Sequence, residues 1–302
     1  MSDMSTNLVH ARDALEGLSV GDAFGEQFFA LLGKHDQPVE RRMLSAPPWE
    51  WTDDTSMALS IFATLRRVGA IDQEALAQSF IDHYDVQRAY GPSMNRMLRE
   101  AGSGRNLPAL AREQFGGQGS HGNGAAMRVA PLGAFLAANL AAVVEQAARS
   151  AEITHTHPEA VAGAIAVAVA AAQAVRWRGS APPSGREFIA AVLPLVPDSE
   201  VASRLRRARD LVEDIAVYHA AAILGSGSAI LALDTVPYAL WCAGRSLGNY
   251  EAALWLTATG LGDIDTTCAI VGGIVAAYTG RSSIPPVWQA AREPLPDWTF
   301  EG

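Results

Sequence analysis

Apolar side chains recur along most of the chain at the three- and four-residue spacing of helices with one buried face. The first helix is expected from Leu8 to Phe24, and a second from Thr55 to about Gly69. Further helices are expected at 72–84, 93–101, 125–136, 140–150, 158–176, 185–193, 199–219, 235–245, 250–257 and 265–278. No stretch of convincing length alternates as a strand does. The pattern therefore predicts an all-α fold, a single compact multi-helix domain spanning residues 1–302.

Two segments lack helical spacing. Gln27–Trp51 is broken by Pro38, Pro47 and Pro48, and Gly102–Gly124 contains seven glycines. Long irregular loops inside a compact domain are often functional. We therefore expect binding or catalytic residues in or beside these two segments.

Composition supports a helical protein with a large core, because 49% of the 302 residues are hydrophobic and only 7% are aromatic. The net charge of −9 and the lack of a basic stripe argue against a general nucleic-acid binder. The one basic cluster, at residues 204–209, is expected to be a solvated helix face. An anionic small ligand stays open, because backbone amides bind phosphate locally.

The sequence favours a cytoplasmic protein that does not enter a membrane. Cys242 and Cys268 lie in apolar helical stretches, as buried core cysteines do, and suggest no disulfide framework. The start of the chain shows no basic region followed by an apolar one, so no signal peptide is expected. The apolar run Val161–Val175 falls short of the roughly 20 residues needed to cross a bilayer, and a buried central helix is expected there.

Two short motifs place acids at helix starts. The first is Trp51-Thr-Asp-Asp-Thr55 and the second is Gly262-Asp-Ile-Asp-Thr-Thr267. Each is explained by helix capping when it is taken alone. Together they offer four carboxylates with hydroxyls and no thiolate, which is the ligand set of hard cations such as Mg²⁺, Mn²⁺ or Ca²⁺. Four acids could hold two divalent ions about 3.5–4 Å apart, as two-metal hydrolytic sites do.

Two further motifs concern a ligand. The glycine-rich stretch Gln114–Arg128 leads into a helix and could hold phosphate through backbone amides, with Phe115 and His121 stacking on a base. A flexible surface loop is the alternative. In Thr154-His-Thr-His-Pro158 the histidines are poorly spaced for zinc. This motif is either a helix start with Pro158 in the first turn or a place where one histidine contacts the ligand.

With these motifs in hand, the chain resembles the ADP-ribosylglycohydrolase family. The matching segments occur in the family's order over nearly the whole chain: Gly17-Leu-Ser-Val-Gly-Asp-Ala-Phe-Gly25, Trp51–Thr55, Gly119-Ser-His-Gly-Asn-Gly-Ala-Ala-Met-Arg128, Thr154-His155 and Gly262–Thr266. The resemblance implies an all-α fold with a binuclear Mg²⁺ or Mn²⁺ site at helix N-termini. It implies removal of ADP-ribose from an ADP-ribosylated protein or another modified acceptor, with a nucleic acid only as a modified substrate.

The resemblance also assigns residues. The metal ligands would be Thr52, Asp53, Asp54, Asp263, Asp265 and Thr266. The substrate-binding residues would be Phe115, Gly119, Ser120, His121, Gly122, Asn123, Gly124, Met127 and His155. Among these, the glycine loop would hold the diphosphate and Phe115 would pack on adenine, while His121 stands where relatives often have tyrosine.

This sequence departs from the family pattern in three places. Leu261 precedes the second motif where glycine is usual, and the stretch Arg88-Ala-Tyr-Gly-Pro-Ser93 stands where some relatives have an acidic residue. Phe29 occupies the position of a catalytic glutamate found in some members. The proton work would then fall to Glu26, or to a metal-binding aspartate such as Asp54 or Asp265. A non-catalytic ADP-ribose-binding module and a hydrolase of another ribosyl compound stay as alternatives.

Overall fold

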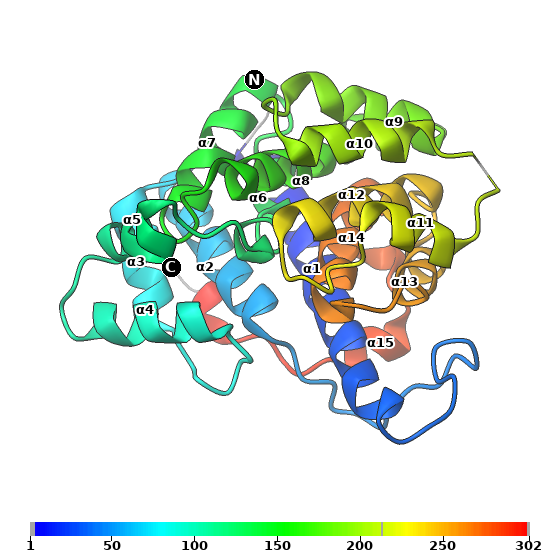
Figure 1. Ribbon diagram of the computed structural model, residues 1–302, viewed down its shortest axis with the longest axis horizontal. Coiled ribbons are helices and arrows are strands. Elements are labelled where there is room, and N and C mark those ends of the chain that lie inside the picture. Colours follow the sequence, from blue (N-terminus) through cyan, green and yellow to red (C-terminus); the bar gives the residue numbers. More distant parts are fainter. Residues whose placement is uncertain (1–3, 213, 301–302) are drawn as a thin grey trace.

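The computed structural model describes residues 4–212 and 214–300. In these residues the regular structure is entirely helical, apart from two isolated bridges that join Trp49 to Arg292 and Gly122 to Leu231. The predicted all-α fold is therefore confirmed (Figure 1). The α-helices are α1 (Met4–Leu32), α2 (Asp53–Val68), α3 (Gln73–Asp82), α4 (Pro92–Gly102), α5 (Leu107–Gly117), α6 (Ala130–Phe135), α7 (Leu140–Glu152), α8 (Pro158–Trp177), α9 (Gly185–Val192), α10 (Glu200–Asp210), α11 (Val217–Leu224), α12 (Ala232–Arg245), α13 (Tyr250–Ala258), α14 (Ile264–Thr279) and α15 (Pro286–Ala291).

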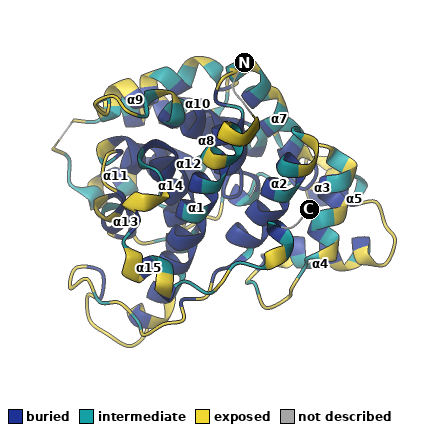
Figure 2. Cartoon of the chain, turned by 180° about the vertical axis from the view of Figure 1, so that it is seen from behind, coloured by how far each residue is buried: buried dark blue, intermediate teal, exposed yellow. Residues whose placement is uncertain are grey.

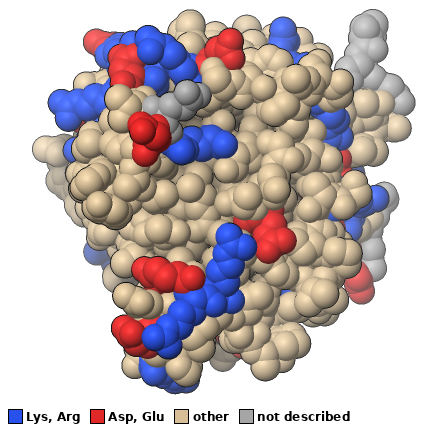
Figure 3. Space-filling view, turned by 90° about the vertical axis from the view of Figure 1, so that its right-hand side faces the viewer, with Lys and Arg blue, Asp and Glu red and all other residues tan. Residues whose placement is uncertain are grey.

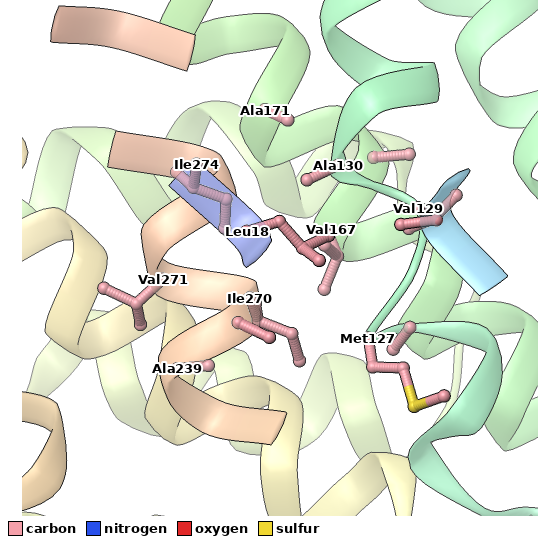
Figure 4. Packing of buried hydrophobic residues seen from close by; sticks show 14 of the residues in the cluster. Leu18, Met127, Val129, Ala130, Val167, Ala171, Ala239, Ile270, Val271 and Ile274 are labelled. Carbon is pink, nitrogen blue, oxygen red and sulfur yellow. The ribbon is translucent and has the colours of Figure 1, made fainter. Parts of the chain in front are cut away.

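The core forms around α1, α8 and α14, which lie in the middle of the molecule and are mostly buried (Figure 2). Leu18 of α1, Val167 of α8 and Ile270 of α14 belong to one apolar cluster (Figure 4). By length and composition α8 could cross a membrane, but 72% of its apolar window is buried inside the protein. It is therefore the buried central helix that the sequence predicts.

Close contact between α1 and α14 depends on glycines spaced four residues apart on one face of α1. A Cβ atom on Gly17 would lie 2.3 Å from the carbonyl oxygen of Gly272, and one on Gly21 would lie 2.2 Å from that of Cys268. A Cβ atom on Gly25 would lie 2.5 Å from Cα of Asp265. Since real Cβ atoms do not approach so closely, the main chains of the two helices touch. This contact brings the start of α14 beside the C-terminal half of α1.

Adding one methyl group to this contact is expected to destabilise the protein. Gly21→Ala should lower the free energy of unfolding by roughly 1–3 kcal/mol, the usual cost of overpacking, because backbone must move. Gly33→Ala is the matched control, since its Cβ atom would meet nothing closer than 3.7 Å. Urea unfolding followed by circular dichroism measures both variants. Equal stabilities would contradict the close contact.

Several predicted boundaries were wrong. The first helix continues to Leu32, so it takes in the start of the segment predicted to be irregular. Within Gly102–Gly124, α5 begins where Asn106 caps its N-terminus by accepting a hydrogen bond from the backbone N–H of Ala109. The abundant glycines hide this short helix. The helix expected over 199–219 is two helices, α10 and α11, because Leu211 takes an extended conformation. The short helix α15 was not predicted.

Charged side chains on the face drawn in Figure 3 form mixed groups of both signs between uncharged areas. The arginines of α10 are largely paired with acids. Arg206 lies 3.4 Å from Asp198, and Arg209 lies 2.7 Å from Asp210. These pairs agree with the solvated helix face expected for residues 204–209.

Candidate active site

The first acid motif forms the N-terminus of α2 and is fixed there by Asp22 of α1. Asp22 is fully buried, and its carboxylate accepts four hydrogen bonds. Two come from the backbone N–H and hydroxyl of Thr52, both at 2.9 Å. Two come from the backbone N–H at 3.1 Å and the hydroxyl at 2.6 Å of Thr55. Asp22 and the hydroxyl of Thr52, which accepts a hydrogen bond from the backbone N–H of Asp54, together cap α2, so neither Asp53 nor Asp54 is needed as the cap.

The second acid motif forms the N-terminus of α14. Asp263 is the residue before the helix and Asp265 lies in its first turn, as predicted. The side-chain amide of Asn123 donates a hydrogen bond of 2.7 Å to the carboxylate of Asp263 and another of 3.0 Å to the hydroxyl of Thr235. Asn123 therefore ties the glycine loop to the second acid motif.

The carboxylates of both motifs share one electrostatic environment. Burial raises the pKa of Asp54 well above its usual value, and the charges of Asp22, Asp265 and then Asp53 raise it further. Burial first, and then the charges of Asp22 and Asp263, raise the pKa of Asp53 to about 8. The pKa of Asp265 is raised well above its usual value by burial and then by the charge of Asp263. Helix starts far apart in the sequence thus meet at one acidic site.

The donor atoms fit a hard divalent cation. Four aspartates and the hydroxyls of Thr52 and Thr266 supply only oxygen. One carboxylate oxygen of Asp54 and one of Asp265 are buried without a hydrogen-bond partner in the described residues. Buried charged oxygens normally have a partner, and a cation would provide one. Over residues 4–212 and 214–300, no three His, Cys, Asp or Glu side chains are already arranged to hold a metal ion, so the ligand set stays a prediction.

Glu26 lies on α1 one turn beyond Asp22 and is partly buried. Burial first, and then the charges of Asp22, Glu50 and Asp263, raise its pKa to about 7. A carboxyl group with this pKa exchanges protons near neutral pH, as a general acid or base must. Its position beside the aspartates keeps it as the leading candidate for that work.

The glycine loop, residues 119–124, packs against His155. A Cβ atom on Gly124 would lie 2.8 Å from Cε1 of the imidazole, so only glycine leaves room for the ring. Nδ1 of His155 is hydrogen-bonded to the hydroxyl of Thr154 at 2.8 Å. Burial, followed by the charge of Arg128, lowers the pKa of His155 to about 3. The imidazole is therefore neutral and can offer a hydrogen bond without adding charge.

The remaining predicted ligand residues lie on or next to this loop. The side chain of Phe115 is 60% exposed, and its ring centre is 6.4 Å from that of His121, which lies 5.1 Å from that of His157. The hydroxyl of Ser120 accepts a hydrogen bond of 3.2 Å from the backbone N–H of Gly122. Met127 differs from these, because its side chain is buried in the apolar cluster (Figure 4). Their contacts with a ligand stay predictions.

Sequence reasoning missed two contributors. Asp22 lies in the family segment Gly17–Gly25, but the sequence assigns no role to it. The available signal was the position of Asp22 between Gly21 and Gly25, two glycines that face α14. The second contributor is the loop from Gly225 to Leu231, where the carbonyl oxygen of Ser226 accepts a hydrogen bond of 3.0 Å from the backbone N–H of Asp263. Its Gly-Ser-Gly-Ser run was the only sign of it.

The raised pKa values predict how the stability of the metal-free protein depends on pH. Asp53 with a pKa of about 8 and Glu26 with one of about 7 bind protons more tightly in the folded state than in the unfolded chain. Their contribution to stability is therefore complete at low pH and is lost as pH rises through these values. The melting temperature of metal-stripped protein should fall between about pH 5 and pH 8. Thermal unfolding in chelator measures it, and a rise over this range would contradict the cluster.

Comparison with known proteins identifies the class of this protein as a glycosidase-type hydrolase of ADP-ribosyl bonds. The chain belongs to the ADP-ribosylglycohydrolase family, whose model matches residues 4–301. It is 30% identical to ADP-ribosylhydrolase ARH3 of Bos taurus over 272 residues, covering 80% of this chain and 74% of that protein. It is 29% identical to ADP-ribosylarginine hydrolase Tri1 of Pseudomonas putida over 293 residues, covering 93% and 73%.

A solved structure, described as an ADP-ribosylglycohydrolase-related protein complex, has the same fold. The TM-score is 0.63 at 24% sequence identity, over 96% of this chain and 94% of the other. The family membership predicted from the motifs is confirmed by these comparisons together.

Proposed function

We propose that the protein removes ADP-ribose from a modified acceptor with the help of two divalent cations, Mg²⁺ or Mn²⁺. The ligands would be Thr52, Asp53, Asp54, Asp263, Asp265 and Thr266. The observation that carries this proposal is the pair of buried carboxylate oxygens, on Asp54 and Asp265, that have no hydrogen-bond partner in the described part of the chain. They belong to two helix starts that α1 brings together.

Different residues would bind the metal ions, position the helix, bind the diphosphate and transfer the proton. Divalent cations bound at the aspartates would supply Lewis-acid chemistry toward the ribose. Asp22 would hold the start of α2 in place through its four hydrogen bonds. Backbone amides of the loop Gly119–Gly124 would bind the diphosphate. Neutral His155 would donate or accept a hydrogen bond, and Glu26 would transfer the proton between water and the leaving acceptor.

The acceptor is proposed to be a protein side chain. The printed name of the Pseudomonas putida relative specifies ADP-ribosylarginine, which makes arginine the first linkage to test. We also propose a cytoplasmic location, because both cysteines are buried and unpaired, as is usual in a reducing compartment.

A substrate panel tests this function. Peptides carrying ADP-ribose on arginine or on serine are incubated with the protein in Mg²⁺, in Mn²⁺ or in chelator, and free ADP-ribose is measured. Release from at least one substrate with metal, and loss of release in chelator, is expected. No release from any substrate with either metal would refute the proposal.

Phe115 gives a prediction about the ligand alone. If its exposed ring stacks on adenine, Phe115→Ala should weaken ADP-ribose binding by roughly 5- to 150-fold, which corresponds to the 1–3 kcal/mol of base stacking. Titration calorimetry measures the affinity. Val287→Ala, which trims a 76% exposed side chain on α15, is the control and should bind as the wild type does. Unchanged affinity in Phe115→Ala would remove the ring from the site.

A further inference from the structure

Trp51, the first residue of the first acid motif, is contacted by an arginine from a different part of the chain. Arg88 lies in the loop between α3 and α4, and its guanidinium carbon is 3.4 Å from the centre of the Trp51 ring. Nη1 of Arg88 also donates a hydrogen bond of 3.0 Å to the carbonyl oxygen of Trp51. One side chain thus contacts both the ring and the main chain of Trp51.

Arg88 is itself oriented by Glu293 near the C-terminal end. The two side chains form a bidentate pair, with Nη1 to Oε2 at 2.7 Å and Nη2 to Oε1 at 2.8 Å. Arg88 is 18% exposed and Glu293 is 29% exposed, so solvent screens the pair only in part. A planar guanidinium can pair with a carboxylate at its edge while its face covers an aromatic ring.

The C-terminal segment also pairs with the main chain at Trp49. The backbone N–H of Trp49 donates to the carbonyl oxygen of Ala291 at 2.7 Å, and that of Glu293 donates to the carbonyl oxygen of Trp49 at 2.9 Å. The indole N–H of Trp51 is buried without a hydrogen-bond partner in the described residues. The ring is therefore fixed by packing and by Arg88 rather than by a hydrogen bond of its own.

We propose that Arg88 and Glu293 act as positioning residues that hold Trp51, and through it set the orientation of Thr52-Asp53-Asp54 in the active site. Asp22 of α1 holds Thr52. Arg88 and Glu293, which together we call the clamp, hold Trp51, the residue before it. With both neighbours fixed, the start of α2 has little freedom to move the acids. This inference rests on the proposed function, since it assigns the clamp to the same site.

Two variants test the clamp with the full chain. Arg88→Met keeps an apolar stem but removes the guanidinium, and Glu293→Gln keeps the size but removes the charge. Each should lower kcat for ADP-ribose release by roughly ten- to a hundredfold, as a small misplacement of catalytic groups does, while KM changes by less than about threefold. Because the two residues act as one unit, the double variant should lose little more than Arg88→Met alone. Arg88→Lys, which cannot pair in a bidentate way, should not restore kcat.

The control is Arg105→Met, which removes an exposed arginine that also pairs with two glutamates, Glu100 and Glu113. It should keep wild-type kcat. Mn²⁺ binding measured by calorimetry gives a readout apart from turnover, and the clamp variants should bind Mn²⁺ at least about fivefold more weakly. The clamp proposal is overturned if both variants keep kcat and Mn²⁺ affinity, or if they lose activity only as far as their folded fraction falls. Wild-type protein that binds Mn²⁺ but hydrolyses no substrate would instead refute the proposed function.

Discussion

Replacing Asp265 by asparagine is expected to lower divalent-dependent release of ADP-ribose by roughly a thousandfold or more. Metal ions contribute several kcal/mol to catalysis at hydrolytic sites, and each 1.36 kcal/mol is a factor of ten in rate. Asp265 has a buried carboxylate oxygen without a hydrogen-bond partner in the described residues, and an amide is a far weaker ligand for a hard cation. Initial rates with saturating Mg²⁺ or Mn²⁺ measure the effect. Asp53→Ala, Asp54→Ala and Asp263→Ala should behave alike.

Stability separates loss of the metal site from loss of the fold. Removing one charge relieves repulsion among the buried aspartates, so Asp265→Asn should melt no lower than the wild type when both are metal-free. In the wild type, added Mn²⁺ should raise the melting temperature by mass action, and this rise should shrink in the variant. Asp198→Asn, at a side chain that is 95% exposed, is the control for both measurements. Full activity of Asp265→Asn in the presence of chelator would exclude the proposed metal chemistry.

Glu26→Gln is expected to lower kcat by roughly 10²–10⁴-fold, the usual contribution of a general acid or base. Glutamine keeps the size of the side chain but cannot exchange a proton, so ADP-ribose affinity should stay within a few-fold. Because burial and the neighbouring acids raise the pKa of Glu26 to about 7, the wild-type rate should change with pH near neutrality, and this pH dependence should disappear in the variant. Rates from pH 5 to pH 9 measure the profile.

Two other glutamates make the interpretation specific. Glu50 contributes to the charge felt by Glu26, whereas Glu40 is an exposed residue of the preceding loop. Because Glu40 is exposed, Glu40→Gln is expected to leave turnover unchanged. If Glu26→Gln kept near wild-type turnover, the role would pass to Glu50, to Glu40 or to the aspartates alone, and the variants Glu50→Gln and Glu40→Gln would distinguish these cases.

The sequence predicted the parts of the site that are local. Asp53 and Asp263 lie at helix starts, as predicted. Their positions could be predicted because helix capping and hydrophobic spacing both depend on residues close together in the sequence. The family motifs then placed these starts in one site, which the shared electrostatics of the aspartates supports. The all-helical fold was equally accessible, since most helices bury one regular apolar face.

The contacts that hold the site together could not be predicted in this way, because they join residues far apart in the chain. Asp22 is 30 residues from Thr52, and Arg88 is 205 residues from Glu293. Nothing in the spacing of a single sequence shows which acid will meet which donor. The sequence predicts only that the stretch from Arg88 to Ser93 departs from the family pattern, whereas the structure shows that Arg88 pairs with Glu293.

The main-chain contact between α1 and α14 has a consequence for how this scaffold can change. Because Gly25 touches the backbone of Asp265, the position of the second acid motif against α1 is set by main chain rather than by side chains that could be exchanged. Insertions or substitutions in the surrounding loops are expected to leave this contact unchanged. Changes of acceptor would therefore be expected in the loops around the site, while Asp263 and Asp265 keep their place against α1.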